Sequence, residues 1–467
     1  MMRTGFVLLA LACTVADGLA AQRPAQRRCL LEILNVDREG SRFAEIANNE
    51  SYYAAGNVRM RCRGQDVFLN GDSVESIGGA VIRLIGKAQY RDADVTIDGD
   101  TLTYLKASEL LQARQAVRIV NKGNGSTLEG PYVDYYRAVR GVRDSAESTA
   151  LSRPTVTYQV PRATGDTIDP SPYLIVADGL KGYGSNRLTG WGNVTVDRDS
   201  LAGRGDSLLY ATGATEEVTL VGNPATLRRA GTDSFSVAGR RVVLGLQGEE
   251  LRRVRALGQG HIVGGAGEII ADSAALDFED GKLIATRAWD RVAKAKVLAE
   301  GYEITGDSVA IDTPNERLRE LRVFGNGMLV EPDSAAVTVT PVDTAVIASD
   351  STEAPIRNTM TGTRLTARFV DHDSAGTVLT QLVDITAIGS ATSLFSRDVE
   401  REGRVSPSIN YTRADTIVVV MRTGDSTGVL EVRAFGNVDG MQLEQETLRR
   451  RASTLPALPA ARREDTP

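Results

Sequence analysis

Apolar and polar residues alternate in short runs along most of the chain, and glycine opens many of these runs. The clearest example extends from Gly190 to Tyr210. Its first half, GNVTV at 192–196, begins with a glycine turn and continues as a β-branched run of period two, which predicts a strand. Its second half, GDSLLY at 205–210, places Leu208 and Tyr210 on one face of an extended segment and Leu209 on the other. Each repeat therefore predicts a pair of strands.

Both halves recur at intervals of roughly 30 residues. The second half returns at Gly71, Gly99, Gly130, Ala177, Gly205, Gly239, Ala271, Gly306 and Gly362. The first half alternates with it at Gly56, Gly86, Gly222, Gly260, Gly325, Gly389 and Gly436. Because two short strands cannot bury their own apolar face, neighbouring repeats must stack and share a core. The sequence predicts an elongated all-β array of two-strand repeats.

Interruptions in the repeats predict the segments of the chain. Residues 1–21 combine Arg3, an apolar run and small residues, which is typical of a secretory signal peptide. We expect the mature protein to be exported. The remaining segments are three repeat arrays at 22–136, 173–332 and 359–443, a Pro-rich loop or hinge at 137–172, an insertion at 333–358 and a disordered tail at 444–467. Within the loop or hinge, residues 155–158 are compatible with one further strand.

Composition narrows the function classes. The 467 residues have a net charge of -6, and no basic stripe with interleaved aromatics is present, so nucleic acid is excluded as a partner. Aromatic residues make up 5% of the chain, and most apolar positions are aliphatic. An aliphatic interior suits acyl chains better than sugars or bases.

Three cysteines are present. Cys13 lies inside the signal peptide, in a sequence context that matches a lipidation site poorly. Cys29 and Cys62 remain after its removal, and the sequence is compatible both with a disulfide between them and with two buried thiols.

Candidate catalytic groups have simpler explanations. Gly-Asp-Ser occurs at Gly71, Gly205 and Gly306, whereas a nucleophile is needed once, at a strained turn beside a base. His261 and His372 are the only histidines and do not have the spacing of paired metal ligands. We interpret the repeated motif as a turn and expect no catalysis, no metal and no cofactor.

Two acidic pairs have a spacing of two residues, which places both carboxylates of a pair on one strand face. A glycoside hydrolase would need such paired carboxylates across a sugar ring. Because each pair brackets the end of a predicted strand, we interpret them as solvent-side turn residues. The pairs are Asp92 with Asp94 and Asp98 with Asp100.

The alternating Gly-Asn-Val and Gly-Asp-x-Leu-x-Tyr half-repeats after a signal peptide resemble the OstA-like family of lipopolysaccharide-transport proteins. This family includes LptA and the N-terminal domain of LptD, and the resemblance covers most of residues 51–443. It implies a β-jellyroll folded like a taco, with an apolar interior that holds lipopolysaccharide acyl chains. It also implies a periplasmic location and end-to-end β-stacking with other transport proteins, which would bridge lipopolysaccharide toward the outer membrane.

If such a groove exists, its lining is predicted at the paired positions that follow each second-half motif. These candidates are Leu102, Tyr104, Leu208, Tyr210, Val242, Leu244, Val309 and Ile311. The same side chains would also fit a closed β core. The alternatives are therefore a structural or adhesive cell-surface β-solenoid without lipid and, less favoured, a β-helix enzyme that acts on polysaccharides.

Overall fold

The computed structural model describes residues 29–37, 51–139, 141–159, 170–184, 187–211, 216–231, 234–247, 250–264, 267–290, 292–299, 301–331, 357–374, 377–401, 404–424 and 428–444. Across these residues the chain is nearly all β, and every pairing between its strands for which the register is defined is antiparallel. The helical content of the described part is one 3-10 turn, η1 (Pro314–Glu316). The predicted all-β array of repeats is confirmed.

The chain forms two compact units. The first contains residues up to Arg228 together with 245–249, and the second contains 229–244 and the residues from 250 onward. The strands of the first unit are β1 (Leu31–Asn35), β2 (Tyr52–Cys62), β3 (Phe68–Ile77), β4 (Val81–Arg91), β5 (Val95–Leu105), β6 (Leu110–Asn121), β7 (Thr127–Tyr136), β8 (Glu147–Leu151), β9 (Thr155–Tyr158), β10 (Tyr173–Val176), β11 (Gly179–Tyr183), β12 (Arg187–Arg198), β13 (Leu201–Ala211) and β14 (Glu216–Arg229).

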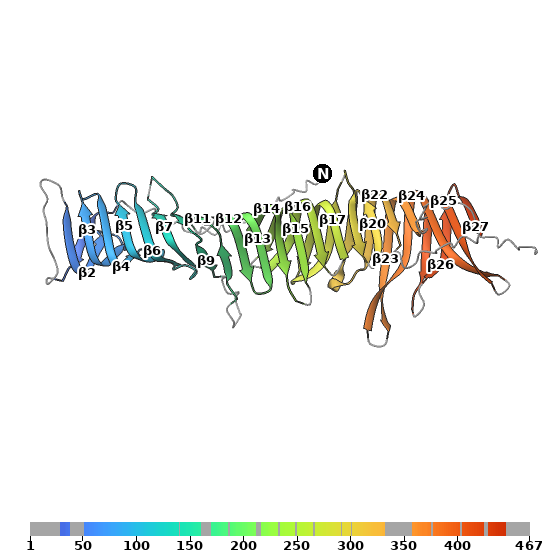
Figure 1. Cartoon of the computed structure of the whole chain (residues 1–467), viewed down its shortest axis with the longest axis horizontal. Coiled ribbons are helices and arrows are strands. Elements are labelled where there is room, and N and C mark those ends of the chain that lie inside the picture. The colour runs from blue at the N-terminus through green and yellow to red at the C-terminus, as the bar shows by residue number, and fades with distance from the viewer. Residues whose placement is uncertain are drawn as a thin grey trace, which may run out of the picture. The chain divides into compact units, whose positions relative to one another are not determined.

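The second unit continues the same strand pattern (Figure 1). Its strands are β15 (Phe235–Gln247), β16 (Glu250–Gly264), β17 (Gly267–Glu279), β18 (Lys282–Trp289), β19 (Ala295–Ala299), β20 (Tyr302–Gly306), β21 (Ser308–Asp312), β22 (Glu320–Val330), β23 (Thr359–Ser374), β24 (Thr377–Arg401), β25 (Arg404–Arg422), β26 (Gly428–Phe435) and β27 (Asp439–Glu444).

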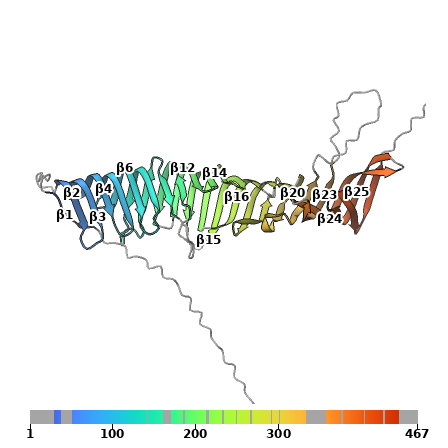
Figure 2. The ribbon, with the colours of Figure 1, turned by 90° about the horizontal axis from the view of Figure 1, so that it is seen from below.

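Successive strands from β2 to β7 are hydrogen-bonded neighbours. They lie side by side in the ribbon (Figures 1 and 2). Every second strand contains a bulge near its middle. In β2, Ala55 pairs with Ser73 and Val58 pairs with Gly71, so Gly56 and Asn57 oppose a single residue, Asp72. Gly56 has φ 95° and Asn57 has φ 46°, a conformation that glycine and asparagine tolerate best.

The bulges divide each unit into two limbs. In the first unit, the first limb contains the paired segments 52–55, 73–77, 81–85, 101–105, 110–114 and 132–136. The second limb contains 58–62, 68–71, 88–91, 95–99, 117–121 and 127–130. Buried apolar residues of both limbs form one core. Each strand therefore bends at the level of the bulges, and its two halves lie on opposite sides of that core.

The two repeat motifs lie at this bend rather than at turns between strands, which corrects the prediction of a glycine turn at the start of a strand and of a turn at Gly-Asp-Ser. The bend explains their composition. Gly306 faces inward where the limbs converge, and a Cβ there would lie 2.3 Å from Val323 Cγ1. The next residue, Asp307, packs on the bulge glycine of the following strand, Gly325. A small residue therefore lies inside this corner, and an aspartate packs on its outside.

The strands continue through the segment predicted as a Pro-rich loop or hinge, 137–172. β8 and β9 both lie in it and pair with β7, and they pair in turn with β11 and β10. The expected strand at 155–158 is present as β9. Ser152 and Arg153 have positive φ between β8 and β9, at the place where other strands have Gly-Asn.

The repeat segment predicted at 359–443 contains β23 to β27. The predicted signal peptide (1–21), nearly all of the predicted insertion (333–358) and all but the first residue of the predicted tail (444–467) lie outside the described residues.

Candidate functional site

The inner face of the first limb is a continuous row of buried, mostly aliphatic positions. In the first unit the pairing connects one such position in each of the strands β2 to β8 and β11 to β13. The members are Ala54, Val74, Leu84, Leu102, Ala113, Val133, Ala150, Leu180, Gly190 and Leu208. Because each is aligned with the next across a hydrogen-bonded pair, the row is an apolar track along the strand stack.

Four of the predicted lining residues lie on this limb in the first unit. Leu102 and Leu208 belong to the row itself, and Tyr104 and Tyr210 lie two residues further from the bend. Leu102, Tyr104 and Leu208 are 0%, 1% and 3% exposed, and Tyr210 is half-buried. Leu209 is 37% exposed, which confirms the predicted alternation of faces.

The second unit repeats this arrangement. Val309 lies in a buried row that extends from β16 to β25, and Ile311 lies two residues further from the bend. Val242 and Leu244 face the interior from β15, and all four of these predicted residues are buried. The members of the row are Ala256, Ala274, Ala288, Val309, Val323, Leu365, Ala387 and Ile417.

None of the lining residues predicted from the sequence lies on the opposing limb, although the sequence of that limb also alternates between apolar and polar residues. Its inward residues in the first unit alternate after each bulge, as Val58 and Met60 do in β2. The other members are Leu69, Ala88, Ile97, Val117 and Ile119, all buried in the same core. An apolar molecule between the limbs would contact both faces.

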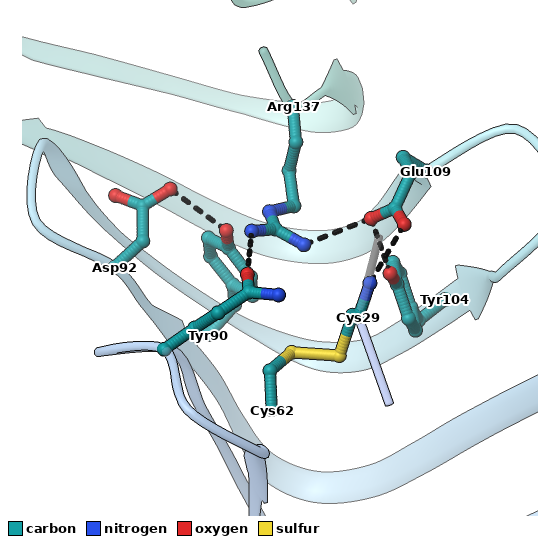
Figure 3. Close-up of a disulfide and its surroundings, with 8 residues drawn as sticks. Cys29, Cys62, Tyr90, Asp92, Tyr104, Glu109 and Arg137 are labelled. Carbon is teal, nitrogen blue, oxygen red and sulfur yellow. Dashed lines mark hydrogen bonds and ion pairs between the residues drawn. A yellow bond between two sulfur atoms is a disulfide. The ribbon is translucent and has the colours of Figure 1, made fainter. Parts of the chain in front are cut away.

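A polar cluster lies at the strand ends away from the bend, which we call the mouth, in β2 to β7 (Figure 3). The side chain of Arg137 is 1% exposed, and its Nη1 lies 2.8 Å from Glu109 Oε2. Its Nη2 donates to Gln65 Oε1 at 2.9 Å. The backbone N–H of Cys29 donates to Glu109 Oε1 at 3.0 Å, and Cys29 forms a disulfide with Cys62. The sequence was compatible with either a disulfide or two thiols, and the structure has the disulfide. It holds in place the backbone N–H of Cys29, which donates to the buried Glu109 carboxylate.

Asp92 is the second buried carboxylate of this cluster. Its Oδ2 accepts hydrogen bonds from Tyr90 Oη at 2.7 Å and from Tyr135 Oη at 3.4 Å. Burial, reinforced by the Asp92 charge, raises the pKa of both tyrosines well above the ordinary value. Burial also raises the pKa of Tyr104, which donates to Glu109. Neither the composition nor the spacing of residues in the sequence predicted this cluster, because its members come from separate strands and turns.

Aromatic pairs connect the limbs at other points along the mouth. Tyr158 of the second limb and Tyr210 of the first have ring centroids 5.6 Å apart, and their hydroxyl oxygens are 3.2 Å apart. Burial and the contacts with Tyr158 and Glu216 raise the pKa of Tyr210. In the second unit, Phe235 and Phe278 are 5.7 Å apart at their centroids. These contacts close the interior over parts of its length.

The remaining chemical candidates occupy structural positions. Ser73, Ser207 and Ser308 lie within strands beside the bend. His261 Nε2 lies 2.8 Å from Glu268 Oε1 on an exposed cross-strand pair, and His372 lies in β23. Among the residues that the structure describes, no three His, Cys, Asp or Glu side chains form a group suited to a metal ion.

The two acidic pairs are not equivalent. Asp92 is buried in the cluster, and its Oδ1 accepts the backbone N–H of Asp94. Asp98 accepts a hydrogen bond from Gln89 at 2.8 Å, and Asp100 is exposed. Neither pair is arranged as two free carboxylates across a cleft.

No protein-family model matches the sequence, and no curated protein matches it either. In the described part of the chain, no helix has the length and hydropathy required to cross a bilayer.

Proposed function

We propose that this chain is a non-catalytic periplasmic lipid-binding protein that holds acyl chains between its two limbs and bridges lipopolysaccharide toward the outer membrane. The observation that supports this most strongly is the aliphatic row on the inner face of each unit, which continues from strand to strand. An acyl chain gains roughly 0.8 kcal/mol for each methylene removed from water. Similar side chains in successive repeats would let a lipid move along the row without a deep trap.

The C-terminal edge of the second unit supports the bridging part of the proposal. β26 and β27 both pair with β25, and the described residues supply no strand on their other side. Leu430 and Phe435 at this edge are 59% and 54% exposed. An unpaired edge with exposed apolar side chains is suited to strand addition by another β protein. Other lipopolysaccharide-transport proteins are the partners we propose for it.

Photo-crosslinking tests the lipid site. A diazirine-bearing aliphatic side chain at Leu208 or Val309 should crosslink to lipopolysaccharide in cells, and the same group at outward-facing Leu209 should not. Equal labelling of both faces, or none, would favour a closed structural solenoid, the alternative that the near-complete burial of the row supports.

A charge in the row provides a second test. Leu208→Asp should abolish crosslinking to lipopolysaccharide from Leu180, which lies in the same row of the first unit, while the thermal transition is retained, if the limbs open around a lipid. In a permanently closed core the same buried charge would chiefly unfold the first unit. Circular dichroism melts distinguish the two results.

A further inference from the structure

We propose that the Arg137 cluster is a permanent seal across the mouth of β2 to β7, which excludes acyl chains from this stretch and makes it the closed end of the lipid track. This inference rests on the proposed lipid-carrier function and adds a boundary to it. It predicts that Leu102 and Tyr104, although they belong to the same limb as Leu208, do not contact lipid.

The seal follows from contacts that join the two limbs. Tyr135 lies at the mouth on the first limb and donates to Asp92, which follows β4 on the second. The rings of Tyr135 and Tyr90 are 5.9 Å apart at their centroids. Arg137 follows β7 on the first limb and donates to Gln65, in the turn between β2 and β3 at the end of the second. These contacts tie the strand ends together on the side opposite the bend.

The N-terminal segment adds a covalent component. Cys29 is joined to Cys62 on the second limb, and its backbone N–H donates to Glu109, which lies between β5 and β6 at the end of the first limb. Glu109 and Arg137 form the ion pair of the cluster. This pair lies on the first limb, and each of its members is bonded to a group tied to the second limb: Arg137 to Gln65, and Glu109 to the Cys29 N–H. Separation of the limbs here would therefore remove a hydrogen-bond partner from each of two buried charged groups.

The energetic cost distinguishes this stretch from the other contacts across the mouth. The contacts across the limbs end on the buried charged groups of Arg137, Glu109 and Asp92. A buried charged group that loses a hydrogen-bond partner is destabilised more than a neutral one, because it loses more when it is left unsatisfied away from water. The Tyr158 and Tyr210 rings are half-buried and joined through their hydroxyl groups, which water can satisfy when they part. Phe235 and Phe278 in the second unit have no polar atoms to satisfy, so an acyl chain can replace either ring as a neighbour. Among these three groups of contacts between described residues, the one in the β2 to β7 stretch resists opening by lipid most strongly.

The consequence is a track with one blocked end. Acyl chains have access to the interior from Tyr158 and Tyr210 onward in the first unit, and their movement toward β2 stops at the seal. The blocked end also separates two roles within one unit, since β2 to β7 stabilise the fold and the later strands hold cargo.

Crosslinking within the first unit tests this proposal. A diazirine-bearing aliphatic side chain is placed singly at Leu102, Leu208 and Leu209 of the full-length protein in cells, and adducts with lipopolysaccharide are quantified. We expect at least tenfold more adduct from Leu208 than from Leu102, with Leu209 as the outward-facing background. Adducts of equal yield at Leu102 and Leu208 would overturn the seal and leave the carrier function intact. No adduct at either position would overturn the carrier function and the seal with it.

A second variant tests the assigned residues. Arg137→Ala combined with Glu109→Ala removes both charges at once, so neither is left unpaired in the core. We expect the Leu102 adduct to rise severalfold in this background, while the Leu208 adduct is unchanged. An unchanged Leu102 yield in a variant that retains its thermal transition would show that the Arg137 and Glu109 side chains are not the barrier. If the variant does not fold, the comparison of adduct yields at Leu102 and Leu208 in the otherwise native protein still tests whether the seal exists.

Discussion

At the scale of single residues, glycine at a bend avoids both backbone strain and a steric clash, and the second unit allows these two effects to be measured separately. Gly325 has φ 75°, and a Cβ on it would lie 2.0 Å from Asp307 Oδ2. Gly281 has nearly the same backbone conformation, φ 76°, with nothing within 4 Å of the added Cβ. One position therefore combines backbone strain and a steric clash, and the other has strain alone.

We predict that Gly281→Ala lowers the free energy of unfolding by about 1–2 kcal/mol, the cost of a left-handed conformation for alanine. Gly325→Ala should lower the free energy of unfolding clearly more than Gly281→Ala does, because Asp307 must also move. Urea denaturation of the two variants, compared with the unmodified chain, measures both. Equal losses would show that Asp307 moves without cost and that the close packing at the bend contributes nothing.

The buried tyrosines of the mouth predict a dependence on alkaline pH. Tyr90 and Tyr135 have folded-state pKa values well above the ordinary 10.0, so in the folded state they stay protonated when an unfolded chain would ionise. Their contribution to stability is complete below pH 10 and is lost as the pH rises above it. Stability measured by urea denaturation should therefore fall between pH 10 and 11. The variant with Tyr90→Phe and Tyr135→Phe should show a smaller fall, and an identical pH profile would contradict the assignment.

At the scale of strands and turns, the Cys29–Cys62 disulfide determines how the N-terminal strand is attached. β1 is only five residues long and pairs with β2 over Cys62 to Arg59, and several of its side chains are exposed. The disulfide spans 33 positions in sequence, and closing a loop of this size in the unfolded chain is worth roughly 3–4 kcal/mol. Backbone pairing with β2 alone contributes little stability to so short a strand.

We predict that Cys29→Ser combined with Cys62→Ser releases β1 while the pairing of β3 to β7 persists. Hydrogen exchange should show loss of protection at residues 29–35 and retained protection in β5 and β6. Protection of β1 at the native level in the double variant would show that backbone pairing and the Glu109 contact are sufficient to hold it.

The strand pattern was predictable from the sequence at this scale, and the position of the bend was not. Alternation at Leu208, Leu209 and Tyr210 correctly separates inward from outward side chains, because a strand has a period of two. Gly192 and Asn193 look like a turn, since positive φ is common to turns and bulges. Only the register on both sides, with Trp191 opposite Ser207 and Val194 opposite Gly205, shows that the strand continues.

The polar cluster could not have been predicted from local pattern. Asp92 was interpreted as a solvent-side turn residue, and its carboxylate does hold a turn through the backbone N–H groups of Asp94 and Val95. Its burial depends on Tyr135, which lies 43 positions later in the chain. Contacts of that separation leave no periodic signal, whereas the inner rows do because each repeat supplies the same position.

At the scale of the whole molecule, a chain built from neighbouring repeats should have local energetics, in which each strand is stabilised mainly by those beside it. The two units each have their own buried rows, which strengthens this expectation. Arg137→Ala leaves Glu109 buried without its partner and should lower the stability of the first unit by about 3–5 kcal/mol. We predict that hydrogen exchange accelerates in β4 to β7 and is unchanged in β22 and β23 of the second unit.

The matched control for this prediction is Arg204→Ala. Arg204 Nη1 lies 2.8 Å from Asp197 Oδ1, a distance like that of the buried pair, but the two side chains are 50% and 38% exposed. Water replaces the lost contact there, so the cost should be below about 1 kcal/mol, with no change in exchange beyond β12 and β13. If Arg137→Ala instead accelerates exchange equally in β4 to β7 and in β22 and β23, the chain unfolds as one cooperative body. A blocked end in the first unit would then also influence how the second unit opens to lipid, because opening of either would be shared by both.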